Sequence, residues 1–373
     1  MSIDMYLPAL PAIGDDLGAG PDQVQLSLSL FFIGAAAGQL VYGPLSDRFG
    51  RRPPLFFGIA IYIAASALAA LSADIDQLIW LRFAQALGAS AASVISRAVV
   101  RDVASGDQAA AMLSLLTLVM GLAPLLAPLV GGQILLWLGW RAIFWLLAIY
   151  GLAALVAVRF WVPETNPPAR RQRLSLLDVA TTYLAVLGHR RALGYLLASG
   201  AGYAGMFAYF SGTPFVYIRY FGVPPEYYGF LFGLNVVAIM AGAYANARLV
   251  VRFGRDRMLA IGTGVVLVAG LALLAAAATG FAGLPGIAAP LFFYLGALNL
   301  IAANGMARVL DFFPTVSGIA AGLFGLAHFG LGAIAGALVG QLHDGTPLPM
   351  AAVIAVCGVA SFTARRLLGR EPA

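Results

Sequence analysis

Two ionisable side chains, Asp4 and Arg82, stand within long apolar stretches of the sequence. Burial disfavours the charged form of a carboxylic acid, so Asp4 is a candidate to take up and release a proton. A buried arginine needs partners inside the protein, and Arg82 can bias the protonation of Asp4 or pair structurally with Gln85 and groups near Asp102. Alternatively, Asp4 caps a distorted helix end and stays ionised.

A second candidate site is a short charged segment between two apolar runs, residues 24–42 and 55–71. Its glycines, acid and arginines are Gly43, Asp47, Arg48, Gly50, Arg51 and Arg52. Pro53 and Pro54 can begin the following helix, where a missing N–H costs nothing. The segment is therefore expected to be a polar hairpin between two helices. A merely solvated loop would explain the arginines but not the spacing of the glycines and the acid.

A third group combines glycine and proline within one apolar run. Its members are Gly121, Pro124, Pro128, Gly131 and Gly132. Small residues allow helices to approach closely, and prolines allow a helix to bend. The run is expected to be either a functional bend or only a packing surface.

One face of the helix that follows residue 191 is predicted to carry adaptable methionine and aromatic side chains. Its residues stand at positions i, i+3, i+4 and i+7: Tyr203, Met206, Phe207 and Phe210. Methionine and aromatic side chains suit a pocket for varied small molecules, although such stripes also occur in cores and on lipid-facing surfaces. Further candidates for the lining of a cavity are Tyr6, Asn235 and Asn299. His328 is expected either to be a second proton site or to be buried neutral.

The elements that must position these residues are membrane-spanning helices. Hydrophobic residues make up 61% of the chain and charged residues 10%, and the mean hydropathy is +0.90. The apolar runs have about the 17 to 25 residues that a spanning helix needs, with most charges in the gaps. We expect eleven complete spans and one incomplete first span, hence an all-α membrane protein.

The net charge of +6 comes from arginine, because the chain has no lysine. If the Asp47 hairpin lies in the cytoplasm, the loops on that side hold most of the arginines and the opposite loops hold only Arg141 and Arg219. This positive-inside pattern explains the basic charge without nucleic acid. It places the linker and the C-terminus in the cytoplasm.

The chain is predicted to form two six-helix halves. The N-terminal half is residues 1–162, a linker is 163–190, the C-terminal half is 191–367 and a tail is 368–373. Residues 48–51, Arg-Phe-Gly-Arg, recur as residues 252–255, each time after the second span of a half, although Val251 replaces Asp47. Parallel duplicated halves are typical of one large class of transporters.

The first span is expected to lack its inner half. Residues 1–11 have the composition of the outer half of a spanning helix. A free amino terminus at mid-bilayer would be a costly buried charge. We therefore expect the natural chain to begin about 20 residues upstream, the length of a full span.

Four segments together resemble one family. Residues 43–52 resemble the signature loop between helices 2 and 3 of the major facilitator superfamily, Gly-x-Leu-x-Asp-Arg-x-Gly-Arg-Arg/Lys. Residues 81–88 resemble its helix 4 motif, and residues 121–132 its helix 5 motif in proton-coupled drug antiporters. Residues 3–11 are similar to the helix 1 signature of the Bcr/CflA branch, which is associated with bicyclomycin and chloramphenicol-type efflux.

The resemblance implies the major facilitator fold and a proton-coupled multidrug transporter of the bacterial inner membrane that exports small drugs by alternating access. Asp4 and Arg82 would couple protons. Asp47 would latch helix 2 to the opposite half, and the neighbouring arginines would hold the inner face closed. The proton gradient would be the energy source, with no cofactor. The partners would be the lipid bilayer, a small-molecule substrate and protons, and the chain would be a monomer. An exporter of amino acids or small peptides is the alternative.

Other classes are disfavoured by the residues that are missing from the sequence. An ATP-driven pump needs the lysine of a P-loop, and the chain has none. An enzyme is disfavoured because neither Gly-x-Ser-x-Gly nor His-Glu-x-x-His occurs. Three histidines and one cysteine are too few for a plausible metal cluster.

The two copies of the Arg-Phe-Gly-Arg motif differ in the acid that precedes them, which gives a first prediction. Asp47→Asn should lower transport more than Asp256→Asn, because only the first copy keeps the acid of the signature loop. Substrate flux at matched membrane expression measures the difference. Equal losses in the two variants would contradict the prediction.

Overall fold

The computed structural model describes residues 1–103, 106–167, 181, 184–313 and 317–369, and all regular elements within these ranges are helices. Ten of the described helices are long and apolar enough to cross a membrane. A further helix, α8 (Arg190–Pro214), has 25 residues. The predicted all-α fold is confirmed, and two short helices stand where the incomplete first span was expected.

The chain divides into two compact units, Met1–Leu176 and Leu177–Ala373. Much of the predicted linker, 163–190, and most of the predicted tail, 368–373, lie outside the described residues. The exact bounds of the predicted halves therefore stay a prediction.

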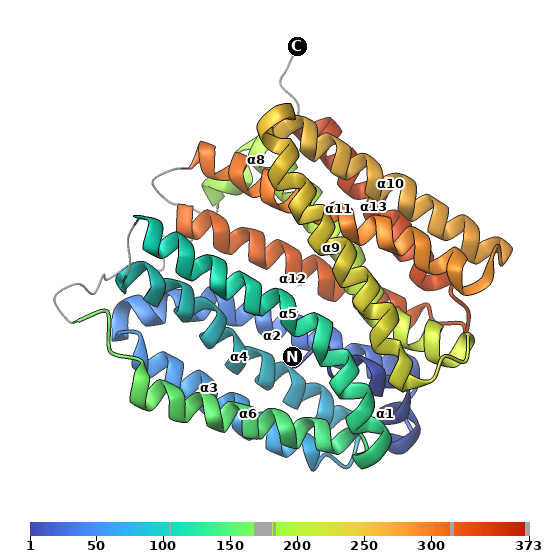
Figure 1. Ribbon diagram of the computed structural model, residues 1–373, viewed down its shortest axis with the longest axis horizontal. Helices are drawn as coiled ribbons and strands as arrows, with labels where there is room; N and C mark the ends of the chain where they lie inside the picture. The colour runs from blue at the N-terminus through green and yellow to red at the C-terminus, as the bar shows by residue number, and fades with distance from the viewer. Residues whose placement is uncertain (104–105, 168–180, 182–183, 314–316, 370–373) are drawn as a thin grey trace. The chain divides into compact units, whose positions relative to one another are not determined.

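The first unit is a helical bundle in which α2 packs along α4, α4 along α3, and α3 along α6 (Figure 1). Its helices are η1 (Leu7–Ala9), α1 (Leu10–Leu17), α2 (Pro21–Phe49), α3 (Arg52–Ala70), α4 (Ile75–Val103), α5 (Gly106–Leu138) and α6 (Trp140–Trp161). Proline occupies the first turn of α2 and α3, as the sequence predicts. A glycine with positive φ, Gly139, separates α5 from α6.

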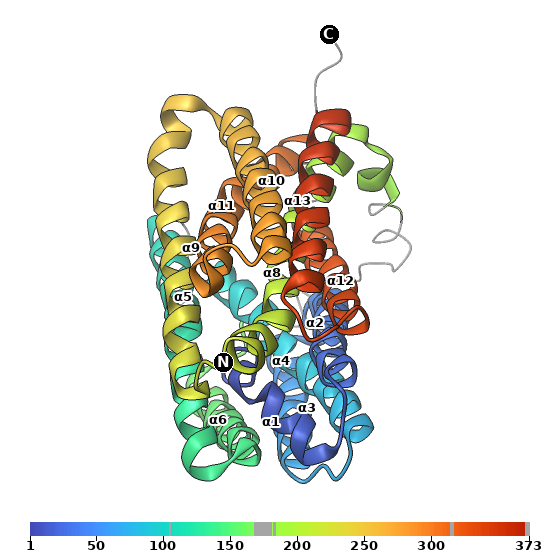
Figure 2. The same cartoon turned by 90° about the vertical axis from the view of Figure 1, so that its right-hand side faces the viewer.

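The second unit repeats this pairing, with α9 along α11, α11 along α10, and α10 along α13; Figure 2 shows α10 beside α13. After α8 its helices are η3 (Phe215–Tyr220, a π-helix), α9 (Pro225–Phe253), α10 (Arg255–Thr279), α11 (Gly283–Phe312), α12 (Ser317–Gln341) and α13 (Leu348–Leu368). The helix in the place of the fifth span of each unit also packs on the first, α5 on η1 and α12 on α8. The same pairing in both units is the pattern that a parallel duplication produces.

Helices α2 and α9 carry the repeat that the sequence indicated. Each has 29 residues and begins at a proline. Each ends at a phenylalanine followed by a glycine of nearly the same backbone conformation, Gly50 at φ 93° and ψ 168° and Gly254 at φ 78° and ψ 159°. Only glycine adopts this conformation readily, so both copies make the same turn for the same reason.

Helices α3 and α4 approach each other through glycines. A Cβ added at Gly88 would lie 2.6 Å from the backbone nitrogen of Tyr62, and one at Gly58 would lie 2.9 Å from the carbonyl oxygen of Gly88. Such distances are too short for a side chain, so the two backbones meet directly. Small residues at a crossing are the usual route to tight packing of membrane helices. This contact fixes the position of α4, which carries Arg82, against α3.

Gly88→Ala should therefore destabilise the protein, because the new methyl group has to push against backbone and cannot displace a flexible side chain. Overpacking of this kind costs about 1–3 kcal/mol. The thermal midpoint of the purified protein should fall by several degrees. Gly330→Ala is the matched control, since a Cβ there would meet nothing within 4 Å. Equal midpoints for both variants would contradict the direct backbone contact.

Candidate functional site

The segment that precedes α1 places Asp4 inside the first unit. Asp4 is 7% exposed, and its carboxylate forms an ion pair with the amino-terminal ammonium of Met1, which donates a hydrogen bond of 2.9 Å. Helix α5 holds this segment in place, because a Cβ added at Gly131 would overlap the backbone of Met5. The glycine of the helix 5 motif thus makes room for the segment that carries the candidate proton carrier.

The other members of the helix 5 motif also lie on α5. Pro124 and Pro128 are inside the helix, and Gly132 is buried like Gly131. Gly121 differs, since a Cβ there would meet nothing within 4 Å. Packing therefore explains Gly131 but not Gly121.

Arg82 is completely buried on α4 and is surrounded by aromatic rings. Its guanidinium carbon lies 4.3 Å from the ring centroid of Tyr6 and 4.2 Å from that of Phe31. Cation–π contacts of this kind stabilise a cation where water is excluded. The expected position of Arg82, facing the interior of the bundle, is confirmed.

The guanidinium of Arg82 has one side-chain hydrogen bond, from Nη1 to the Oε1 atom of Gln85. Gln85 in turn donates to the hydroxyl of Ser66 on α3 at 2.7 Å. Within the described part of the chain, Nε and Nη2 of Arg82 have no hydrogen-bond partner. The predicted pairing with Gln85 is present, whereas Asp102 bonds to Arg51.

Arg82 contacts the first-span segment through the ring of Tyr6. Among the described residues, Arg82 and Asp4 form no hydrogen bond or ion pair with each other. The hydroxyl groups of Tyr6 and Ser27 lie 2.8 Å apart, which joins the segment to α2. Ser2 is similarly joined to α3, with its hydroxyl 2.8 Å from that of Tyr62. Aromatic and hydroxyl contacts therefore couple the environment of Asp4 to the buried cation.

The hairpin between α2 and α3 is a network of charged groups centred on Arg51. Arg51 Nη1 donates to Asp47 Oδ1 at 2.6 Å, and Arg51 Nε donates to Asp102 Oδ2 at 2.8 Å. Asp102 lies at the end of α4, so the arginine joins three helices. Of the other predicted residues, Arg52 donates to the carbonyl oxygen of Arg159, and Arg48 lies over the ring of Phe49.

The chain that follows α6 closes the network from the other side. The carboxylate of Glu164 accepts the backbone N–H groups of Arg51, at 2.8 Å, and Arg52, at 3.1 Å. The side-chain amide of Asn166 donates to the carbonyl oxygens of Ser46 and Asp47. Glu164 thus satisfies N–H groups at the start of α3 and places a negative charge at its positive end.

The charge of Arg51 does not depend on pH in the accessible range. Burial disfavours the charged guanidinium, but the hydrogen bonds to Asp102 and Asp47 outweigh burial and raise the pKa of Arg51 above its ordinary value.

The second unit has its own ion pairs at the corresponding hairpin. Arg255 Nη1 lies 2.8 Å from Asp311 Oδ2 on α11, as Arg51 pairs with Asp102 on α4. Asp256 pairs with Arg308. Asp311 thus corresponds to Asp102, which the two motifs alone did not reveal, while Val251 leaves the position of Asp47 without an acid.

The predicted aromatic face of α8 divides into two environments. Phe207 is buried against α12, where a Cβ at Gly332 would overlap its ring. Tyr203, Met206 and Phe210 are half-buried. Only these three have the partial exposure that a cavity lining requires.

The polar candidates on neighbouring helices make internal bonds. The amide of Asn235 donates to the Tyr209 hydroxyl at 3.0 Å, and the amide of Asn299 donates to the carbonyl oxygen of Ile239 at 3.2 Å. Both bonds hold helices of the second unit together. A role of either residue in binding substrate stays a prediction.

The sequence alone did not indicate the contribution of Glu164 and Asn166 to the hairpin network. Both lie in residues 163–167, directly after α6, which the sequence indicated only as the start of a linker. A signal was present, since Glu164 is an acid between a long apolar helix and a cluster of arginines. Its partners could not be named, because the contact spans more than a hundred residues of sequence.

Two units with the same order of helix pairing, a buried intramembrane cation and matching ion-paired hairpins define a membrane transport protein of duplicated architecture. The chain belongs to the major facilitator superfamily, whose family model matches residues 1–370. This confirms the predicted fold and family, and the protein is a transporter and not an enzyme.

The chain has relatives in three bacteria, and the names of two of them support the resemblance to the Bcr/CflA branch. The chain is 34% identical over 362 residues to a bicyclomycin resistance protein homolog of Haemophilus influenzae, covering 97% of this chain and 91% of the relative. It is 35% identical over 361 residues to the uncharacterized MFS-type transporter YdgK of Bacillus subtilis, covering 96% and 89%. It is 37% identical over 277 residues to a chloramphenicol resistance protein of Pseudomonas aeruginosa, covering 74% and 64%.

Solved structures share the fold at low sequence identity. A D-xylose-proton symporter matches with a TM-score of 0.74 at 16% identity, covering 99% of this chain and 95% of that one. A peptide transporter matches with a TM-score of 0.77 at 16% identity, covering 99% and 90%.

Glu164→Ala should loosen the start of α3, because it removes the acceptor of two backbone N–H groups. Loss of a helix cap costs about 0.5–2 kcal/mol. Amide hydrogen exchange at Arg51 and Arg52, whose N–H groups Glu164 accepts, should become faster by roughly 2- to 30-fold. Glu226→Ala, which removes an acid from the first turn of α9, is the control and should leave this segment unchanged. Unchanged exchange after Glu164→Ala would contradict the capping role.

Proposed function

We propose that this transporter exports small drugs and antibiotics across the bacterial inner membrane in exchange for protons, by alternating access. The observation that carries the proposal is the 34% identity to a bicyclomycin resistance protein homolog over 97% of the chain. A relative named for chloramphenicol resistance and relatives named multidrug resistance protein support the same substrate class.

Asp4 is the residue that we propose to carry the proton. It is an almost fully buried carboxylic acid in a segment of irregular and 3-10 backbone that α5 holds at Gly131. An ionisable residue at such a depth is usually functional, because an inert one would be selected against by its cost. Arg82 acts on it through the aromatic ring of Tyr6, and protonation of Asp4 changes the charge that this cation faces.

The hairpin network is proposed to stabilise one of the two conformations that alternate. Arg51 ties the α2–α3 turn to α4, and Glu164 ties it to the segment after α6. A transporter needs discrete arrangements of rigid elements, and such a network makes one arrangement of the first unit stiff. Asp47, Arg48 and Arg52 contribute at its surface.

Asp4→Asn tests the proton coupling, because asparagine keeps the size of the side chain and cannot ionise. In everted inner-membrane vesicles with an acidic lumen, the wild-type protein should accumulate labelled chloramphenicol or bicyclomycin, and collapse of the gradient should abolish accumulation. The Asp4→Asn variant should show no response to the gradient. Asp76→Asn, which changes an exposed acid on α4, is the control and should respond like the wild type.

Two results would overturn the proposal. Accumulation by Asp4→Asn that still follows the gradient would remove Asp4 as the proton carrier. If amino acids or dipeptides compete with the drugs so that neither drug is taken up in their presence, a metabolite exporter would be favoured.

A further inference from the structure

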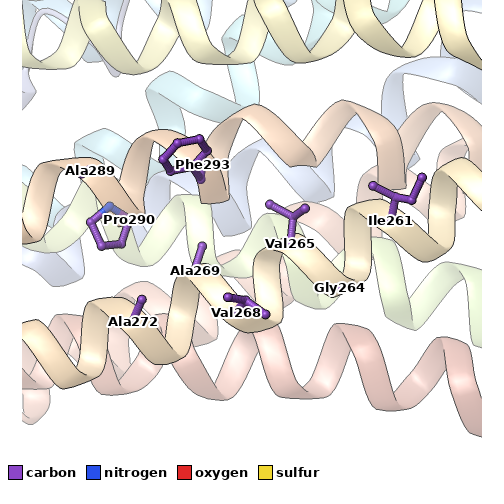
Figure 3. Close-up of a pocket in the computed structure, with 9 residues that line it drawn as sticks. All are labelled: Ile261, Gly264, Val265, Val268, Ala269, Ala272, Ala289, Pro290 and Phe293. Atoms are coloured by element: carbon purple, nitrogen blue, oxygen red, sulfur yellow. The ribbon is translucent and has the colours of Figure 1, made fainter.

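A shallow apolar groove of about 640 Å³ runs between α10 and α11 in the second unit. Figure 3 shows Val265, Ala269 and Ala272 of α10 beside Pro290 and Phe293 of α11. Every residue that lines the groove is apolar. An occupant therefore gains contact area here but no hydrogen bond, as a hydrocarbon chain would.

The length of the groove fits one leaflet of a bilayer. On α10 it extends from Ile261 to Ala272, which is about 16 Å at about 1.5 Å of rise per residue. Half of a hydrocarbon core about 30 Å thick is about 15 Å. A single acyl chain of ordinary length matches this distance.

Two arginines stand at the end of the groove nearest Ile261. Arg257 precedes Ile261 by one helical turn and so lies on the same face of α10. Its guanidinium carbon is 5.3 Å from the ring centroid of Phe253, and that of Arg252 is 5.5 Å from the same ring. The shared ring keeps both cations close together where the spans end.

The acids near this pair are engaged elsewhere. Asp256 pairs with Arg308, and Asp311 pairs with Arg255. In the described ranges neither Arg252 nor Arg257 has an ion pair with an acid. Two uncompensated cations beside an apolar groove at a membrane interface make a complementary surface for an anionic headgroup with a hydrocarbon chain.

We propose that an anionic phospholipid binds at this place, with its phosphate on Arg252 and Arg257 and one acyl chain in the groove between α10 and α11. A second copy of this chain fits less well, because two copies would bring like-charged arginine pairs together. The site is separate from the residues assigned to transport, so its test does not depend on the proposed substrate.

Native mass spectrometry of the full-length detergent-purified protein tests the proposal. The protein is mixed with equal amounts of phosphatidylglycerol and phosphatidylethanolamine that carry identical acyl chains. The wild type should retain phosphatidylglycerol preferentially. The double variant Arg252→Gln/Arg257→Gln should lose about 30-fold in apparent affinity, since one arginine near a membrane surface contributes about 5-fold.

A matched control separates this site from general attraction to arginine. Arg365 and Arg366 also share one ring, that of Phe362, at 5.9 and 5.4 Å, but Phe362 does not line the groove. Arg365→Gln/Arg366→Gln should leave the preference unchanged. Equal losses in the two double variants would overturn the proposal.

A third variant tests the groove without changing charge. Gly264 lines the groove, and a Cβ there would meet no protein atom within 4 Å. Gly264→Leu should therefore leave the thermal midpoint unchanged and lower lipid retention. Full retention in this variant would overturn the proposed place of the acyl chain, and so would a wild-type dimer that Gly264→Leu converts to monomer.

Discussion

A cation in an apolar bundle cannot be stabilised by water, and the first unit meets this constraint around Arg82. Water would supply up to five hydrogen bonds to a guanidinium, whereas the protein supplies Gln85 and the faces of aromatic rings. Those rings come from the first-span segment and from α2, and Gln85 is held by α3. The charge therefore makes four parts of the chain depend on one another.

The two polar regions of the first unit are stabilised in opposite ways. Around Arg82, contacts with rings are weakly directional, so they tolerate small displacements of the guanidinium. Around Arg51, the geometry is set by short charge-assisted hydrogen bonds that the guanidinium donates to two carboxylates, which fix positions closely. The buried cation is thus held by contacts of low directionality, whereas the hairpin is held by bonds of defined geometry.

The sequence was sufficient for the fold because the governing patterns are local. Long apolar runs, prolines at helix starts and a glycine after each second helix all act within a few residues, and the helices follow them. The depth of Arg82 could be predicted from its distance to both helix ends. Its partners could be predicted only in part, since Gln85 is one turn away but Phe31 belongs to another helix.

The parts that could not be predicted depend on contacts across the chain. Glu164 reaches Arg51 only because α6 returns beside α3. The periodicity of α8 places Phe207 on the same face as Tyr203. The ring of Phe207 is nevertheless buried, because a glycine on α12 leaves room for it. Spacing along one helix defines a face, but the neighbouring helix decides which of its residues are covered.

The matching turns at Gly50 and Gly254 have a consequence for how the two halves diverged. Backbone conformation at a glycine fixes the direction of the chain, so the flanking side chains are not needed to hold the turn. Charges around it can then be exchanged without loss of the helix arrangement, as Val251 at the position that corresponds to Asp47 illustrates. A duplicated transporter can in this way keep one backbone arrangement while the charged groups of its two halves take on different roles.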